Sequence, residues 1–191
     1  SYDSKKSGGL TVSHLRFGDT PIRSEYLIQE ADYIACHNES FLNSGYDLTE
    51  GLKENGIFVL NTQYGAEQIG GKLPKEMVHA LIKKNARLYL IDAGKLAHSL
   101  GLGNRINMIM QGAFFHLTGI LPEEKALDCL KDSIQAAYGK KGADIVEKNI
   151  KAAEYGFRET KLVPVELLQS TREERENVQE PEFIENILRP M

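Results

Sequence analysis

The apolar residues of this chain fall into short runs that alternate with amphipathic stretches. The runs Tyr33–Cys36, Ile57–Leu60 and Arg87–Ile91 are short and bounded by polar residues, as expected of strands buried in a sheet. Around them, apolar residues recur every three to four positions, which predicts helices. Strands that alternate with helices indicate a parallel sheet covered on both faces. The pattern predicts an α/β fold, a three-layer α/β/α arrangement with a largely parallel sheet.

The same pattern sets the expected bounds of the elements. Strands are expected at Leu10–Phe17, Ala31–His37, Ile57–Leu60 and Arg87–Ile91. Helices are expected at Tyr46–Glu54, Pro74–Lys84, Ala93–Leu100, Asn104–Thr118, Pro122–Tyr138 and Gly142–Phe157, with a short helix or turn at Pro21–Gln29. Asn55-Gly56 is expected to end the first of these helices as a C-cap, and Asp92 to cap the third.

Length and composition narrow the classes of protein to which the chain can belong. Its 191 residues are enough for one domain with a full core. No apolar run approaches the ~20 residues that span a bilayer, and residues 1–9 are too polar for a signal peptide. The net charge of −4 argues against nucleic acid as a partner. We therefore expect a cytoplasmic protein without a membrane or nucleic-acid partner.

The last part of the chain differs in composition from the rest. From Thr171 onward there are six acidic and three basic residues, so this stretch carries −3 of the net charge. Such a stretch is typical of an extended, solvated C-terminal tail, or alternatively of a disordered terminus. Residues 1–160 are therefore expected to form the α/β domain, and 161–191 an extended tail or linker to a next domain.

The two cysteines, Cys36 and Cys129, are far apart and form no CxxC pair. This usage fits a reducing compartment and argues against a zinc or iron–sulfur site in the chain. Cys36-His37 could suggest a catalytic dyad, but neighbouring residues of a strand point to opposite faces. Cys36 is therefore interpreted as a small core residue.

Polar residues follow several of the predicted strands, where open α/β sheets bind their ligands. They are His14, His37-Asn38, Asn61-Thr62 and Asp92. Each could serve a site or be an ordinary loop residue or helix cap. No self-sufficient catalytic set and no metal-binding cluster stands out.

Three local features could contribute to a site for a phosphate-bearing ligand. Ser4–Gly18 places two lysines and a Gly-Gly turn before an apolar run, although the spacing matches no P-loop. Gly101–Asn107 leads into an apolar helix whose free N–H groups could meet an anion, or is simply a capped helix start. Asn149 lies beside an apolar stripe and needs a partner, which could be backbone, water or ligand.

Several ordered strings of the chain resemble the gamma domain of the pyruvate:ferredoxin oxidoreductase family, also called pyruvate synthase. They run through most of the chain, at Tyr2–Gly9, Thr11–Gly18, Pro21–Ser24, Ala31–Asn38, Phe58–Asn61, Gly101–Gly103, Arg105–Gln111 and Ala137–Gly142. The resemblance implies that the chain lacks the first βα unit of that domain, and with it a glycine-rich segment that contacts coenzyme A.

The resemblance also implies a role. The family oxidatively decarboxylates pyruvate on thiamine diphosphate, forms acetyl-CoA and CO2, and passes electrons through iron–sulfur clusters to ferredoxin or flavodoxin in anaerobic metabolism. Thiamine diphosphate, Mg²⁺ and the clusters would lie on other domains, so no catalytic or metal-binding residue is expected here. The implied coenzyme A contacts are Lys6, Asn107 and Asn149. The implied partners are the other domains of the same enzyme, a homodimer when complete, and the chain alone would be inactive.

Two alternatives stay open at this point. The substrate could be another 2-oxoacid, because substrate choice would lie outside this domain. The chain could also be a structural assembly module of a related oxidoreductase, with no ligand bound by the isolated chain.

Overall fold

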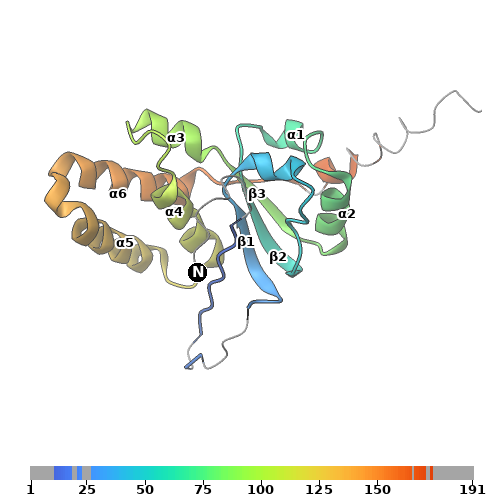
Figure 1. Cartoon of the computed structure of the whole chain (residues 1–191), viewed down its shortest axis with the longest axis horizontal. Helices are drawn as coiled ribbons and strands as arrows, with labels where there is room; N and C mark the ends of the chain where they lie inside the picture. The colour runs from blue at the N-terminus through green and yellow to red at the C-terminus, as the bar shows by residue number, and fades with distance from the viewer. Residues whose placement is uncertain (1–10, 19–20, 23–26, 165, 171–172, 174–191) are drawn as a thin grey trace, which may run out of the picture.

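The computed structural model describes residues 11–18, 21–22, 27–164, 166–170 and 173. Its centre is a four-stranded sheet in which the strands lie in chain order (Figure 1). The strands are β1 (Ala31–Cys36), β2 (Leu52–Asn61), β3 (Arg87–Ile91) and β4 (Lys161–Leu162). The first three are parallel, and the short β4 runs antiparallel to β3. The predicted three-layer α/β/α fold with a largely parallel sheet is confirmed.

Helices cover both faces of this sheet. They are α1 (Ala66–Ile69), α2 (Lys75–Lys83), α3 (Ala93–Ser99), α4 (Asn107–Thr118), α5 (Glu123–Tyr138) and α6 (Ala143–Arg158), with the 3-10 helices η1 (Glu39–Asn43) and η2 (Gly139–Lys141). Figure 1 shows α1 and α2 on one side of the sheet and α3, α4 and α6 on the other, with the α5–α6 hairpin reaching outward.

The core divides into clusters because successive residues of a strand point to opposite faces. Phe58 and Leu60 of β2 pack with the side chains of α2, whereas Ile57 and Val59 pack with those of α4. Phe58, Val59 and Leu60 have no exposed surface, so β2 is the centre of both clusters. A third cluster joins α5 to α6 and includes Ile134.

Most of the predicted elements are confirmed. β3 matches its predicted bounds, β2 contains the predicted run, and α2, α3, α5 and α6 lie within one or two residues of prediction. Asp92 caps α3 as expected, since its Oδ1 accepts a hydrogen bond from Lys95 N at 2.9 Å. The apolar helix α4 begins at Asn107, three residues after the predicted Asn104, because a turn at residues 102–106 places Leu102 in the core.

The predicted helix Tyr46–Glu54 is wrong. Residues 48–51 form turns instead, and β2 begins at Leu52. Gly51 has a φ of 73°, which a helix does not allow, and a Cβ at this position would lie 2.6 Å from Gln29 O. Two leucines at helical spacing suggested the helix, but this close approach to a distant segment excludes it.

Asn55-Gly56 is therefore not a helix C-cap. Asn55 has a φ of 57° and lies inside β2, where the pairing with β1 passes from Leu52 to Ile57 while β1 advances by only two residues. The extra residues form a bulge, which Asn55 N anchors by donating to Lys84 O at 2.8 Å.

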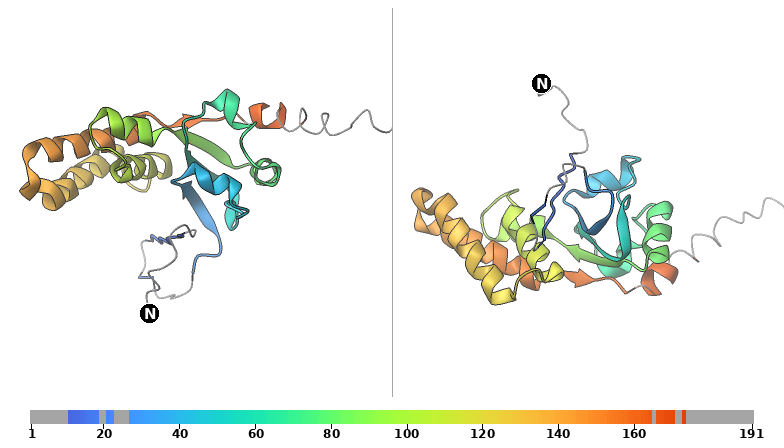
Figure 2. Two further views of the ribbon diagram at one scale, coloured as in Figure 1. Left: turned by 45° about the horizontal axis from the view of Figure 1, so that its top comes forward. Right: turned by 90° about the horizontal axis from the view of Figure 1, so that it is seen from below.

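The predicted strand Leu10–Phe17 is also wrong where the structure describes it. Residues 11–18 form no strand, all eight are exposed, and in the described part of the chain β1 pairs with β2 alone. A β-branched run becomes a strand only where a neighbouring strand accepts its hydrogen bonds. Figure 2 shows this dark blue segment standing out from the body on the β1 side.

The beginning of the predicted tail packs against the body of the protein. β4 lies at residues 161–162, Val163 is buried on the α2 side of the sheet, and residues 166–170 are helical with Leu168 buried. The predicted domain boundary near residue 160 stays a prediction, and most of the acidic tail lies outside the described residues.

Candidate functional site

The carboxyl ends of the parallel strands are joined by the side chain of Asn61, the last residue of β2. Its Nδ2 donates to His37 O at 2.9 Å, just after β1, and its Oδ1 accepts from Ala93 N at 2.9 Å, at the start of α3. One amide therefore ties together the ends of β1 and β2 and the helix that follows β3. Both the nitrogen and the oxygen of the Asn61 amide are therefore engaged within the fold.

Thr62 and Glu39 form a second polar contact at the same edge of the sheet. Thr62 is buried, and its Oγ1 donates to Glu39 Oε2 at 2.5 Å. Thr62 was expected at this edge from the sequence, whereas Glu39 was not, because the 3-10 helix η1 brings it into reach. Both groups satisfy each other, so the contact stabilises the η1 loop.

Cys36 and His37 do not form a dyad. The Cys36 thiol lies in the core cluster on the α2 side and donates to Asn38 O at 3.2 Å, and burial raises its pKa. His37 follows with an exposed side chain, although the surrounding protein removes enough water to lower its pKa. The interpretation of Cys36 as a core residue is confirmed.

Asn107 lies at the start of α4. Its side chain is exposed, and the residue before it, Ile106, provides no side-chain cap for the helix. The first N–H groups of a helix have no intrahelical acceptor and carry the positive end of the helix dipole. Arg105 is also exposed in the preceding turn. This end of α4 therefore combines amide donors with a nearby cation.

Asn149 lies on α6 and is only 4% exposed. Its Nδ2 donates to Ile145 O at 2.7 Å, one turn earlier in the same helix, so backbone provides the partner that the sequence left open. Among the described residues no hydrogen bond to its Oδ1 is found, and this oxygen is not one of the fully buried atoms without a partner, so it keeps some contact with solvent. The amide is therefore half engaged, with its oxygen as the remaining acceptor.

The structure brings the elements that carry Asn107 and Asn149 together. α4 and α6 pack closely, because a Cβ on Gly112 of α4 would lie 2.1 Å from Ala153 O of α6. The loop before α4 also approaches α6, since a Cβ on Gly101 would lie 3.9 Å from Lys148 Nζ. The body of α4 thus packs against Ala153 and Gly156, and the loop before α4 lies near Lys148; we call this region the corner of α4 and α6. Lys6, the third predicted contact, lies outside the described residues.

Lys148 is a further cation at this corner, and it was not among the candidate residues expected from the sequence. Its Nζ is 2.7 Å from Asp144 Oδ2 in an i,i+4 pair on α6. The pair is solvent-accessible and contributes little to stability. Its position beside Gly101 places a positive charge next to the loop that leads to Asn107.

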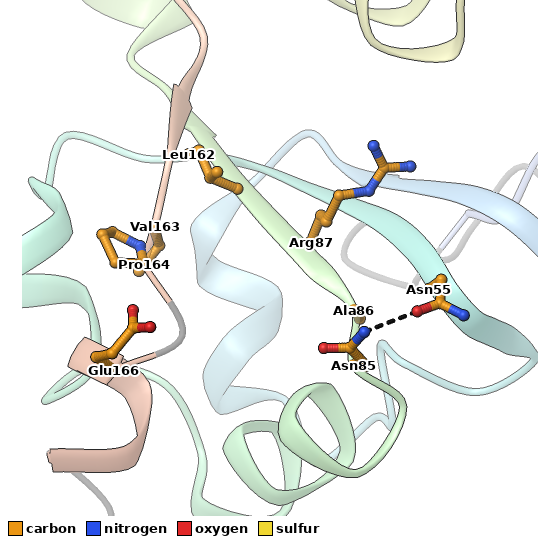
Figure 3. Close-up of a pocket in the computed structure, with 8 residues that line it drawn as sticks. All are labelled: Asn55, Asn85, Ala86, Arg87, Leu162, Val163, Pro164 and Glu166. Carbon is orange, nitrogen blue, oxygen red and sulfur yellow. Dashed lines mark hydrogen bonds between the residues drawn. The ribbon is translucent and has the colours of Figure 1, made fainter.

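A separate groove of about 450 Å³ lies at the amino ends of β2 and β3 (Figure 3). Asn55, Asn85, Arg87 and Glu166 supply its polar groups, and Asn85 Nδ2 donates to Asn55 Oδ1 at 2.7 Å on one side of it. Neither Asn107 nor Asn149 lines this groove. Ligands of open α/β sheets bind at the opposite, carboxyl ends of the strands, so the groove is not the favoured site.

Two further properties of the described residues limit the chemistry. No three or more of their His, Cys, Asp or Glu side chains are grouped as a metal site would require. Their helices are too short or too polar to cross a bilayer.

Comparison with known proteins shows to which family the chain is similar. A family model described as "Pyruvate ferredoxin/flavodoxin oxidoreductase" matches residues 1–159. The chain is 46% identical to pyruvate:ferredoxin oxidoreductase of Moorella thermoacetica and 45% identical to a probable pyruvate-flavodoxin oxidoreductase of Escherichia coli. Both matches cover 100% of this chain but 16% of the relative, so the chain spans about a sixth of the length of these relatives.

A solved structure supports the fold. A pyruvate oxidoreductase subunit from Thermotoga maritima superposes with a TM-score of 0.57 at 23% identity, over 72% of this chain and 67% of that subunit. At this identity the likeness concerns the arrangement of helices and strands.

Proposed function

This chain belongs to the pyruvate ferredoxin/flavodoxin oxidoreductase family, and from that membership we propose that it acts as one domain of a complete 2-oxoacid oxidoreductase. The complete enzyme would decarboxylate pyruvate oxidatively to acetyl-CoA and CO2 and pass electrons to ferredoxin or flavodoxin. Within it, this domain binds part of coenzyme A through Lys6, Asn107 and Asn149 and contacts the other domains.

The observation that carries the coenzyme A proposal is the corner formed by α4 and α6. Coenzyme A combines phosphate groups with the amides of its pantetheine arm. The start of α4 offers N–H groups, the Asn107 amide and the Arg105 charge to a phosphate or carbonyl oxygen. Asn149 Oδ1 offers an acceptor to an amide N–H, in a place where the rest of its side chain is already held.

In this role the domain binds and orients a substrate and performs no chemistry of its own. Lys6 would act as a point charge on a phosphate. Holding the coenzyme A thiol in one orientation makes its meeting with the acyl intermediate effectively unimolecular. Iron–sulfur clusters would belong to other domains, since the two cysteines of this chain cannot supply the four thiolates of a cluster. Thiamine diphosphate is assigned to other domains on the family resemblance alone.

The experiment is calorimetry of coenzyme A binding to the full-length polypeptide that carries this segment. Asn107→Ala is expected to weaken binding about tenfold, the usual loss of a hydrogen bond to a charged group. Asn104→Ala, an exposed asparagine of the same loop, is the matched control and should bind as the wild type does. Lys6→Ala should likewise weaken coenzyme A binding, and Lys5→Ala, the neighbouring lysine, is its matched control.

Asn149→Leu separates a binding role from a structural one. Replacing a half-engaged buried amide by an apolar side chain of similar size should leave the melting temperature unchanged or higher. Coenzyme A affinity should nevertheless fall. If Lys6→Ala, Asn107→Ala and Asn149→Leu all bind coenzyme A as the wild type does, the domain is instead a purely structural module of a related oxidoreductase.

A further inference from the structure

Four aromatic side chains gather where β1, α4 and the segment before β1 meet. The ring of Phe114 lies 5.1 Å from that of Tyr33, edge to face, and 5.3 Å from that of Phe115. Phe17 covers Phe114 from outside at 5.7 Å. We call Phe17, Tyr33, Phe114 and Phe115 the aromatic edge.

The Tyr33 hydroxyl is the feature of this cluster that points to a missing contact. Its oxygen is buried and has no hydrogen-bond partner, and among the described residues it is the one buried side-chain polar atom in that state. A buried hydroxyl without a partner is costly, and buried tyrosine hydroxyls usually find one. The hydroxyl is therefore positioned for an acceptor that lies outside the described residues.

The segment over this cluster is unusually apolar for an exposed one. Its large apolar side chains are Val12, Leu15, Phe17, Ile22 and Leu27, with exposures of 61%, 68%, 54%, 48% and 72%. These five residues fall within sixteen positions of the chain, and exposed apolar residues grouped in this way are typical of an interaction surface. The same segment borders β1, whose backbone pairs on one side with β2 alone among the described strands.

We propose that the aromatic edge is the docking surface for a further part of the family's longer polypeptide. That part would be apolar where it meets Leu15 and Phe17 and would present a hydrogen-bond acceptor to Tyr33 Oη. The inference rests on the proposed function, in which this chain contacts other domains. We choose this occupant because the relatives are about six times as long as the matched segment. The rest of such a polypeptide could supply the segment that covers the Tyr33 hydroxyl and the edge of β1.

Tyr33→Phe tests the hydroxyl through the sign of its effect. In the 191-residue chain alone, the variant should leave the exchange of the β1 amide hydrogens unchanged or slow it, because an orphaned hydroxyl is removed. In the full-length polypeptide the same variant should speed this exchange about two- to tenfold, because a hydrogen bond is lost. Tyr89→Phe, a half-buried tyrosine of β3, is the matched control and should act alike in both preparations.

Leu15→Cys tests whether the surface is covered, in a background where Cys129→Ser removes the exposed thiol. Labelling by a maleimide should be at least tenfold slower in the full-length polypeptide than in the 191-residue chain. Ile120→Cys, at the turn between α4 and α5, calibrates the reagent in each preparation. Because Leu15 is exposed and outside the core, the substitution leaves the fold intact.

Equal labelling of Leu15→Cys in both preparations overturns the proposal. Slow labelling of Leu15→Cys in the isolated 191-residue chain that becomes fast on dilution also overturns the proposal, because the surface is then covered by a second copy of the chain. Coenzyme A binding, measured on the same full-length sample, keeps the two proposals apart. If coenzyme A binds but Leu15→Cys is not protected from the maleimide, the docking surface is wrong. If Leu15→Cys is protected but coenzyme A does not bind, the coenzyme A role is wrong.

Discussion

Gly112 of α4 and Gly156 of α6 lie directly against each other where the two helices cross. A Cβ on Gly156 would lie 2.8 Å from Gly112 Cα and 2.1 Å from Ile109 O, distances that no side chain tolerates. The two glycines therefore set how closely the helices that carry Asn107 and Asn149 approach. Glycine is required at both positions because of this close packing and not because of the backbone conformation, since both residues are helical and have an ordinary φ.

Gly112→Ala should destabilise the protein by about 3 kcal/mol or more, because the added Cβ forces α4 and α6 apart. For a chain of this size, that corresponds to a fall in melting temperature of about 6–12 °C, measurable by calorimetry. The helix propensity of alanine would raise stability only by about 1 kcal/mol, so the clash decides the sign.

Gly65→Ala is the control for this substitution. Gly65 precedes α1 with a φ of −78°, and a Cβ there would meet no atom within 4 Å. Its melting temperature should stay the same or rise slightly. If Gly112→Ala melts like Gly65→Ala, the close crossing of α4 and α6 is wrong.

Asn61→Ala should cost about 1–3 kcal/mol, because it leaves Ala93 N and His37 O without the partner that Asn61 provides. Ala93 is fully buried, so water cannot easily replace the lost acceptor. The measurement is the midpoint of urea denaturation, with Asn43→Ala as the control on an exposed asparagine. A midpoint equal to that of the control would mean that the ends of β1, β2 and α3 are held together by other contacts.

The central strands and most helices could be predicted because their signal is local. Ile57–Leu60 is buried on both faces, so its apolar run is continuous, and Arg87–Ile91 lies beside it. The elements that failed depend on distant residues. Gly51 is held by its approach to Gln29, and Asn55 by its bond to Lys84.

The candidate site could be predicted only in part, for the same reason. The position of Asn149 beside an apolar stripe indicated that it needs a partner, but only the structure shows that Ile145 O supplies one. Lys148 was not expected to contribute, because only folding places it beside Gly101, 47 positions earlier in the chain. The unpaired Tyr33 hydroxyl has no signature in a strand-like run of apolar residues.

The two thiols should differ strongly in reactivity. Cys129 is exposed on α5, whereas Cys36 is buried and its raised pKa disfavours the reactive thiolate. A disulfide reagent at neutral pH should therefore modify one thiol quickly and the second only as the protein unfolds. Cys129→Ser should remove the fast phase and keep the slow one. A fast phase that persists in this variant would show that Cys36 is accessible.

His37 should make the stability of the protein depend on pH. Its folded-state pKa is lowered below the ordinary 6.5, because the surrounding protein removes water from the imidazole. The unfolded chain therefore binds a proton more readily than the folded one, and stability is lost as the pH falls through about 6.5. Above that pH both states hold the neutral imidazole, and the contribution disappears.

His37→Gln keeps the carbonyl that accepts from Asn61, so it removes the titration and preserves that bond. The free energy of unfolding, measured from pH 8 to pH 5.5, should fall less steeply in the variant than in the wild type. Identical slopes would show that the water around His37 is the same in the folded and unfolded states.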